Sequence, residues 1–228
     1  MTPEKFSAVL FDLDGVLVDT ETIIGELWAD IFTGHGLNLT PSEITRLTSG
    51  QRFEGVMQAL DEQRGWKAPE DFLPMLDQRF NGAFSHVPSI EGAADTLRAL
   101  QAAGIPFAVA SNSEKGRLHM KLRGAGLADL VEPHAYDPSY VGGLGKPAPD
   151  LYLYAAAQLG AEPGRCLVIE DSVPGARAGL AAGATVWALL AGGHILPDDE
   201  AHLLELGAAR VLHSHADLRA ALEVQTLV

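Results

Sequence analysis

Two aspartates, Asp12 and Asp14, stand at the end of an apolar run near the N-terminus and are followed by Gly15. The run 6–11 has the length and composition of a strand that is buried on both faces. Side chains two residues apart on an extended chain point to the same side, so both carboxylates can reach one small volume. Because like charges repel there, a counter-charge is implied, and the simplest is a divalent cation with oxygen ligands. The competing interpretation is an Asp-rich turn that ends a strand without any chemistry.

Two further strand-like runs end in polar pairs, and a loop between them carries a lysine. In chain order these residues are Ser111 and Asn112, then Lys146, then Glu170 and Asp171. The carboxyl ends of parallel strands meet at one edge of a sheet, and the ligand crevice of such a sheet lies at this edge. We therefore expect these side chains and the two aspartates to face the same crevice.

The chemistry that suits this set is phosphoryl transfer. One aspartate, Asp12 or Asp14, can attack phosphorus to form an aspartyl-phosphate. The other can act as general acid on the leaving oxygen and then as general base on water. Glu170 and Asp171, together with Asp12, provide the hard oxygen ligands that Mg²⁺ prefers.

The predicted phosphate-binding residues are Ser111, Asn112 and Lys146, which offer a hydroxyl, an amide and an ammonium group to the phosphoryl oxygens. Four carboxylates beside a phosphate dianion repel one another strongly, and one lysine does not offset this repulsion, so a metal ion is required. Two alternatives stay open. Ser111 and Asn112 are also good helix caps, and Glu170 can orient the metal ligands from behind instead of binding the metal.

Composition and charge exclude several classes of protein. The chain has 228 residues, of which 47% are hydrophobic and 20% charged, so it can bury a core and is not disordered. A formal net charge of −14 argues against non-specific binding to nucleic acid or to anionic membranes. The single cysteine, Cys166, excludes an intramolecular disulfide and suits a reducing compartment. With no signal-peptide pattern and no apolar run of spanning length, we expect a cytoplasmic protein. The sequence does not reveal the oligomeric state, and a monomer is the default expectation.

The pattern of elements predicts an α/β fold, a doubly wound parallel sheet with a small all-helical domain inserted after the first strand. Residues 1–17 and 88–228 form the predicted core domain, and residues 18–87 form the helical cap. In the cap we predict a helix with Thr20 as its N-cap, a short helix from Pro41, a polar turn at 48–52, and helices from Phe53 to Gly65 and from Pro69 to Phe84. In the core we predict strands at 106–110, 130–131, 166–169 and 184–189 and helices at 91–103, 114–123, 149–159, 173–182, around 203–206 and from 217.

Taken in order, the four polar segments resemble the four motifs of the haloacid dehalogenase superfamily of phosphotransferases. The stretch 12–16, Asp-Leu-Asp-Gly-Val, is similar to the first motif, with Asp12 as nucleophile and Asp14 as general acid/base. Ser111 is similar to the second motif and Lys146, in Gly-Lys-Pro-Ala-Pro-Asp, to the third. Residues 170–172, Glu-Asp-Ser, are similar to the fourth.

The resemblance extends from about residue 6 to 190 and has consequences for the metal site and the insert. It implies a Mg²⁺ held by Asp12, the main-chain carbonyl of Asp14 and Asp171, with Glu170 bound to it or just behind. The helical insert resembles the cap of one subgroup, the β-phosphoglucomutase-like phosphatases. Closure of such a cap would exclude water, with hinges near 17–20 and 87–89.

Within this subgroup, we expect a hydrolase acting on a small sugar, sugar-acid or polyol phosphate. The mutase motif has a histidine ten residues after its second aspartate, where this chain has Ile24. The mutase also has an arginine in a polar turn of its cap. The matching turn here is Gly50, Gln51 and Arg52, with the arginine one position early, so it can hold a substrate carboxylate or hydroxyls, or be only a solvated residue. The alternatives are a phosphosugar mutase and a non-enzymatic phospho-accepting module.

Overall fold

Six strands form one parallel sheet in the order β3-β2-β1-β4-β5-β6. The computed structural model describes residues 6–40, 43–44, 47, 53–192 and 198–223. The strands are β1 (Ala8–Phe11), β2 (Phe107–Ala110), β3 (Ala135–Tyr136), β4 (Cys166–Glu170), β5 (Thr185–Leu189) and β6 (Arg210–Leu212). All neighbouring strands pair in parallel, which confirms the predicted doubly wound sheet. The strand order reverses between β1 and β4, so their carboxyl ends flank the switch point at which such folds bind ligands.

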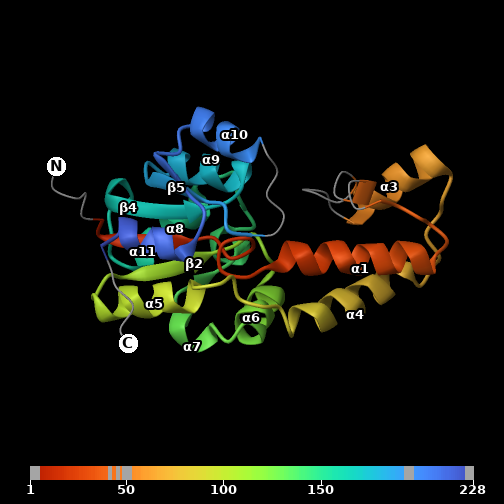
Figure 1. Ribbon diagram of the computed structural model, residues 1–228, viewed down its shortest axis with the longest axis horizontal. Coiled ribbons are helices and arrows are strands. Elements are labelled where there is room, and N and C mark those ends of the chain that lie inside the picture. Colours follow the sequence, from red (N-terminus) through yellow and green to blue (C-terminus); the bar gives the residue numbers. More distant parts are fainter. Residues whose placement is uncertain (1–5, 41–42, 45–46, 48–52, 193–197, 224–228) are drawn as a thin grey trace.

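Helices cover both faces of the sheet (Figure 1). One face carries α5 (Ala93–Ala102), α6 (Lys115–Gly124), α7 (Ala128–Val131) and α11 (His215–Ala221). The other carries α8 (Asp150–Gln158), α9 (Val173–Ala181) and α10 (Asp199–Leu206), and two short 3₁₀ turns lie at Pro138–Val141 and Pro163–Arg165. Side chains of β1 alternate between the two faces of the sheet and so contribute to both hydrophobic cores. Val9 and Phe11 pack in the first helical layer, and Ala8 and Leu10 in the second.

A group of helices lies between β1 and β2 in the sequence and has a hydrophobic core of its own. Its helices are α1 (Thr20–Gly34), α3 (Phe53–Arg64) and α4 (Phe72–Phe84). Their apolar faces meet around Trp28, which stacks on Phe32 at 4.8 Å between ring centroids and meets Phe80 edge-on. Figure 1 shows α1 and α4 running together away from the sheet. The predicted helix from Pro41 is only partly described, and the turn at 48–52 lies outside the described residues.

The two chain segments that join this helical insert to the sheet pair with each other. Val18 forms a bridge with Ser89, the Asp19 amide donates to the Pro88 carbonyl at 3.0 Å, and the amide of residue 90 donates to the carbonyl of residue 17 at 2.9 Å. Gly15, with φ of +79°, allows the chain to turn directly after Asp14. The chain therefore leaves and re-enters the core at adjacent points, close to both predicted hinges.

Two local predictions were wrong, and one strand was missed. Asp19, and not Thr20, is the N-cap of α1, because the Thr20 hydroxyl is buried and donates to Asp14 instead. The predicted strand 130–131 is the end of helix α7, and the strand that pairs with β2 follows at 135–136, where two residues are too few to leave a periodic pattern. Strand β6 was not predicted, because it is an edge strand of three residues of which one is buried.

No helix in the described part of the chain is long and apolar enough to cross a membrane. The lone cysteine, Cys166, is buried at the start of β4, as expected for an inert core thiol.

His215 joins the last helix to the loop that carries the aspartates. Its ring is fully buried, Nε2–H donates to the Val16 carbonyl at 2.8 Å, and Nδ1 lies 3.0 Å from the Thr96 hydroxyl. Burial, opposed by the Val16 hydrogen bond and aided by the charge of Arg219, lowers the pKa of His215 from 6.5 to about 4. The imidazole is therefore neutral in the folded protein at neutral pH.

We expect this histidine to make the fold sensitive to acid. Because its pKa is lower in the folded than in the unfolded chain, its stabilisation is complete above pH 6.5 and is lost as the pH falls towards 4. Between about pH 7.5 and about pH 5 the loss should be about 2 kcal/mol of unfolding free energy, measured by urea denaturation. His215→Asn should flatten this pH dependence. The matched control, His213→Asn, changes a side chain that is 63% exposed and should leave it unaltered. Equal pH slopes for wild type and His215→Asn would contradict the expectation.

Candidate active site

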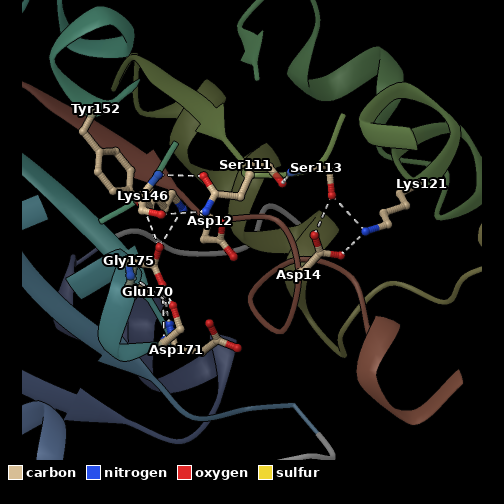
Figure 2. A network of polar contacts seen from close by, with 12 residues as sticks. Asp12, Asp14, Ser111, Ser113, Lys121, Lys146, Tyr152, Glu170, Asp171 and Gly175 are labelled. Atoms are coloured by element: carbon tan, nitrogen blue, oxygen red, sulfur yellow. Dashed lines mark hydrogen bonds and ion pairs between the residues drawn. The ribbon is translucent and has the colours of Figure 1, made fainter. Parts of the chain in front are cut away.

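Asp12 is the first residue after β1 and lies at the switch point of the sheet, next to the end of β4. Lys146 links the two strand ends, because its Nζ donates to Asp12 Oδ1 at 2.5 Å and to Glu170 Oε1 at 2.6 Å. The Lys146 ammonium also lies 4.7 Å from the ring centroid of Tyr152, whose hydroxyl donates to Glu170 Oε1 at 2.8 Å. Figure 2 shows these side chains converging on one point. The structure thus brings together three of the predicted motifs: the first through Asp12, the third through Lys146 and the fourth through Glu170.

Glu170 is fully buried and accepts five hydrogen bonds within the described part of the chain. Oε1 receives Lys146 and Tyr152, and Oε2 receives the amides of Asp171 and Ser172 and the Ser172 hydroxyl at 2.9 to 3.2 Å. Helix α9 starts here, with Ser172 as its N-cap. Both oxygens of Glu170 are therefore used in fixing the site, which favours the alternative in which it orients the metal ligands.

Gly175 makes room for the Glu170 carboxylate against α9. A Cβ at this position would lie 1.7 Å from Glu170 Oε1 and 2.2 Å from Oε2. No side chain can therefore occupy residue 175 while Glu170 keeps its position (Figure 2).

The donor set fits a divalent cation. Asp12, Glu170 and Asp171 are all buried and can each offer a carboxylate oxygen, with these atoms within 4.8 Å of one another. Lys146 is the positive charge that contacts two of them, so the fully ionised cluster would carry excess negative charge. Small hard cations such as Mg²⁺ are bound by carboxylate oxygens of this kind. The carboxylate of Asp14 is not part of the cluster.

The ionisation of Asp12 reflects this excess of negative charge. Burial raises its pKa well above the usual range, Lys146 opposes that rise, and the charges of Glu170, Asp171 and Asp14 add to it. For Lys146, burial alone would lower the pKa, but the charges of Asp12 and Glu170 and their hydrogen bonds raise it above its ordinary value. A cation beside Asp12 would favour the carboxylate form that nucleophilic attack needs.

Ser111 and Asn112 follow β2 at the same edge, but they act differently. Ser111 is buried, and its Oγ accepts the Ser113 amide at 3.1 Å. The Asn112 side chain forms two hydrogen bonds with the backbone of Lys146. Its Nδ2 donates to the Lys146 carbonyl at 3.0 Å, and its Oδ1 accepts from the Lys146 backbone N–H at 2.7 Å. Asn112 thus holds the backbone of Lys146, and a contact between the second Nδ2 hydrogen and phosphate stays a prediction.

Asp14 belongs to a separate network, to the side of Asp12 (Figure 2). Its Oδ1 accepts the Thr20 hydroxyl at 2.7 Å and Lys121 Nζ at 2.7 Å, and its Oδ2 accepts the Ser113 hydroxyl at 2.9 Å. Burial would raise the pKa of Asp14, but the charge of Lys121 and the hydrogen bonds from Lys121, Thr20 and Ser113 lower it below the ordinary value. The two aspartates are therefore held by different partners, and their pKa values shift in opposite directions, although we expected both carboxylates to reach one small volume.

Several residues of the site were not identified from the sequence: Thr20 as a partner of Asp14, Ser113, Lys121, Tyr152 and Gly175. A signal existed for Lys121. At helical spacing it falls on the same face as Leu118 and Leu122, both of which are buried, and a lysine on a buried face needs a partner. The predicted substrate turn of Gly50, Gln51 and Arg52 lies outside the described residues.

Comparison with known proteins gives a consistent result. The residue pattern of haloacid dehalogenase-like hydrolases matches residues 6–183. A HAD family hydrolase from Deinococcus radiodurans R1, whose crystal structure has bound phosphate and sodium, is 60% identical and covers 96% of each chain with a TM-score of 0.89. Hexitol phosphatase A of Escherichia coli is 31% identical over 90% of this chain and 89% of its own. The bifunctional riboflavin kinase/FMN phosphatase of Arabidopsis thaliana is 31% identical over 93% of this chain, which spans only 54% of that relative's length.

Proposed function

The chain belongs to the haloacid dehalogenase-like hydrolases, and on this premise we propose that it is a Mg²⁺-dependent phosphatase of small sugar, sugar-acid or polyol phosphates. The family and the phosphatases among the relatives support an enzyme that hydrolyses phosphate monoesters. The observation that carries the finer proposal is the buried cluster of Asp12, Lys146, Glu170 and Asp171 at the switch point of the sheet.

In the proposed reaction, a carboxylate oxygen of Asp12 attacks phosphorus while the ester oxygen leaves. Because Lys121 keeps Asp14 ionised in the free enzyme, Asp14 first takes up a proton, from solvent or from the monoanionic phosphate ester, and then gives it to that oxygen as the alcohol departs. Water then attacks the aspartyl-phosphate, Asp14 takes a proton from it, and the bond between Asp12 and phosphorus breaks. Lys146 and the Ser111 hydroxyl are the proposed donors to the phosphoryl oxygens.

We propose that Mg²⁺ would be held by the carboxylates of Asp12 and Asp171 and the main-chain carbonyl of Asp14, with Glu170 behind them. Bound there, the cation would neutralise charge on the phosphoryl group as the bonds change. Support comes from the three clustered carboxylates and from the five hydrogen bonds that already occupy Glu170.

We also propose that residues 18–87 are a cap over this site, inserted into a core of residues 1–17 and 88–228. The separate hydrophobic core of the insert and the paired connections at Val18 and Ser89 support this division. In such a cap the turn at 50–52 would contact the part of the substrate that is not phosphate. The lone buried Cys166 suits a reducing compartment, and we propose a cytoplasmic monomer.

The hydrolase is preferred to a mutase because of residue 24. A mutase needs an extra acid/base group for a sugar hydroxyl at this point, and Ile24 instead packs against the hydrophobic core of the insert. The hexitol phosphatase among the relatives makes a polyol or sugar phosphate the first class to test.

The test is phosphate release from a panel of sugar, sugar-acid and polyol phosphates, nucleotides and β-glucose 1-phosphate, with Mg²⁺ or with EDTA. We expect release concentrated on one class, loss of nearly all of it in EDTA, and recovery when Mg²⁺ is added in excess. Full activity in EDTA would refute the metal requirement. Conversion of β-glucose 1-phosphate to glucose 6-phosphate without phosphate release would identify a mutase. A labelled aspartyl-phosphate that persists without turnover would indicate a phospho-accepting module.

A further inference from the structure

We propose that Lys121 is a positioning residue for Asp14, which it holds at the edge of the site as Lys146 holds Asp12. The inference rests on the proposed phosphatase chemistry and assigns a part in it to a residue outside the four motifs.

Lys121, Ser113 and Asp14 form a closed set of contacts (Figure 2). Lys121 Nζ donates to Asp14 Oδ1 at 2.7 Å and to Ser113 Oγ at 2.9 Å, and Ser113 Oγ donates to Asp14 Oδ2 at 2.9 Å. With the Thr20 hydroxyl on Oδ1, both oxygens of Asp14 are held from fixed directions. A carboxylate held in this way has one orientation, which a side chain with a single contact would not have.

The burial of Lys121 is difficult to explain by packing alone. Lysine is among the residues least often buried, and an ammonium out of water is costly unless it is paired. Lys121 is nevertheless only 5% exposed, and its charged end points to Asp14 and not to solvent. A leucine would fill this face of α6 at lower cost, so the position of the ammonium indicates a role for its charge.

The helical insert fixes the lysine from its other side. The Lys121 ammonium lies 4.5 Å from the ring centroid of Phe84, the last residue of α4. One turn earlier on α6, Arg117 pairs with Asp77 of α4 and contacts Asn81 at 3.3 Å. Helix α6 therefore places Lys121 between the insert and Asp14, so its ammonium has little freedom to move.

In the proposed reaction Asp14 acts on the leaving oxygen and then on water, and it forms no bond to phosphorus. Loss of its positioning should thus slow proton transfer and leave substrate binding intact. The rate of phosphoenzyme formation, the first step, should fall only for substrates whose leaving group needs a proton. Nitrophenolate leaves without one, whereas a sugar or polyol alkoxide does not.

The experiment compares Lys121→Met with wild type on p-nitrophenyl phosphate and on the best alkyl phosphate of the panel. For the alkyl ester we expect kcat to fall about ten- to a hundredfold, with KM within about twofold. For the nitrophenyl ester, labelled phosphoenzyme should form at the wild-type rate and then accumulate, because its hydrolysis still needs Asp14. Lys115→Met, an exposed lysine of the same helix, is the matched control and should match wild type on both esters.

Two further variants keep the test decisive if Lys121→Met does not fold. Ser113→Ala removes the donor to Oδ2 and keeps the lysine, so it should show the same pattern in weaker form. Lys121→Arg keeps the charge and should retain more alkyl-phosphate turnover than Ser113→Ala or Lys121→Met. Unchanged kcat, an equal slowing of phosphoenzyme formation from both esters, or a rise in KM alone would overturn the proposal. A wild-type chain that releases no phosphate from any ester would instead refute the proposed function.

Discussion

Asp12→Asn is expected to abolish phosphate release and to leave the fold intact. An amide oxygen is a poor nucleophile and forms no stable phosphoenzyme, so turnover should fall at least about a thousandfold. The substitution also removes a carboxylate whose pKa is raised by burial and by three like charges, while Lys146 keeps Glu170 as its partner. The unfolding free energy should therefore change little or rise.

Phosphate release, labelling of the phosphoenzyme and urea unfolding together test this expectation. Asp95→Asn is a suitable control, because the Asp95 side chain is 47% exposed and pairs with Arg98 of its own helix, α5. It should retain wild-type turnover. If Asp12→Asn were folded and still turned over its substrate, the nucleophile would be another residue and the proposed mechanism would be wrong.

Gly175→Ala is expected to lower both the stability and the turnover of the protein, although Gly175 has no side chain that could take part in the reaction. The new Cβ would overlap the Glu170 carboxylate, and the carboxylate cannot move without breaking its hydrogen bonds to Lys146, Tyr152 and Ser172. Breaking one side of a buried charge network costs about 3–5 kcal/mol, so the unfolding free energy should fall by that order. Turnover should fall as well, since Lys146 would lose one of its two anionic partners.

A control glycine and a double substitution separate this clash from a general helix effect. Gly116, near the start of α6, has no neighbouring atom within 4 Å of the point that a Cβ would occupy, so Gly116→Ala should be neutral or stabilise the protein by about 0.5–1 kcal/mol. In a chain that already carries Glu170→Ala, Gly175→Ala should cost little more, because its clash partner is gone. Equal losses from Gly175→Ala with and without Glu170 would show that the clash is not the cause.

The positions that the sequence predicts well are those determined by the backbone alone. Parallel strands carry the residues after their carboxyl ends to one edge, so Asp12, Glu170 and Asp171 were expected to meet, and they do. The alternating layers of the core followed from apolar strands separated by amphipathic helices. The same reasoning could not separate the networks of Asp12 and Asp14, since spacing along a strand says nothing of which donors surround each side chain.

The residues that were missed depend on how helices dock. Lys121 reaches Asp14 only because α6 lies between the sheet and α4, and Gly175 matters only because Glu170 folds back against α9. Asn112 was expected to bind phosphate from its place after β2, and its further contact with the backbone of Lys146, in a distant loop, was not foreseen. Such contacts join segments far apart in the sequence, and no local pattern records them.

The pairing of Val18 with Ser89 marks a place where the helical insert could be exchanged without disturbing the sheet. The chain departs and returns through neighbouring backbone positions, so the whole insert is, to the sheet, a single long loop whose two ends touch. Exchange of everything between these positions for the matching segment of a relative would leave the strands and the residues after them where they are. If the insert contacts the substrate as we propose, this exchange would transfer substrate preference as one module and leave the residues at the strand ends unchanged.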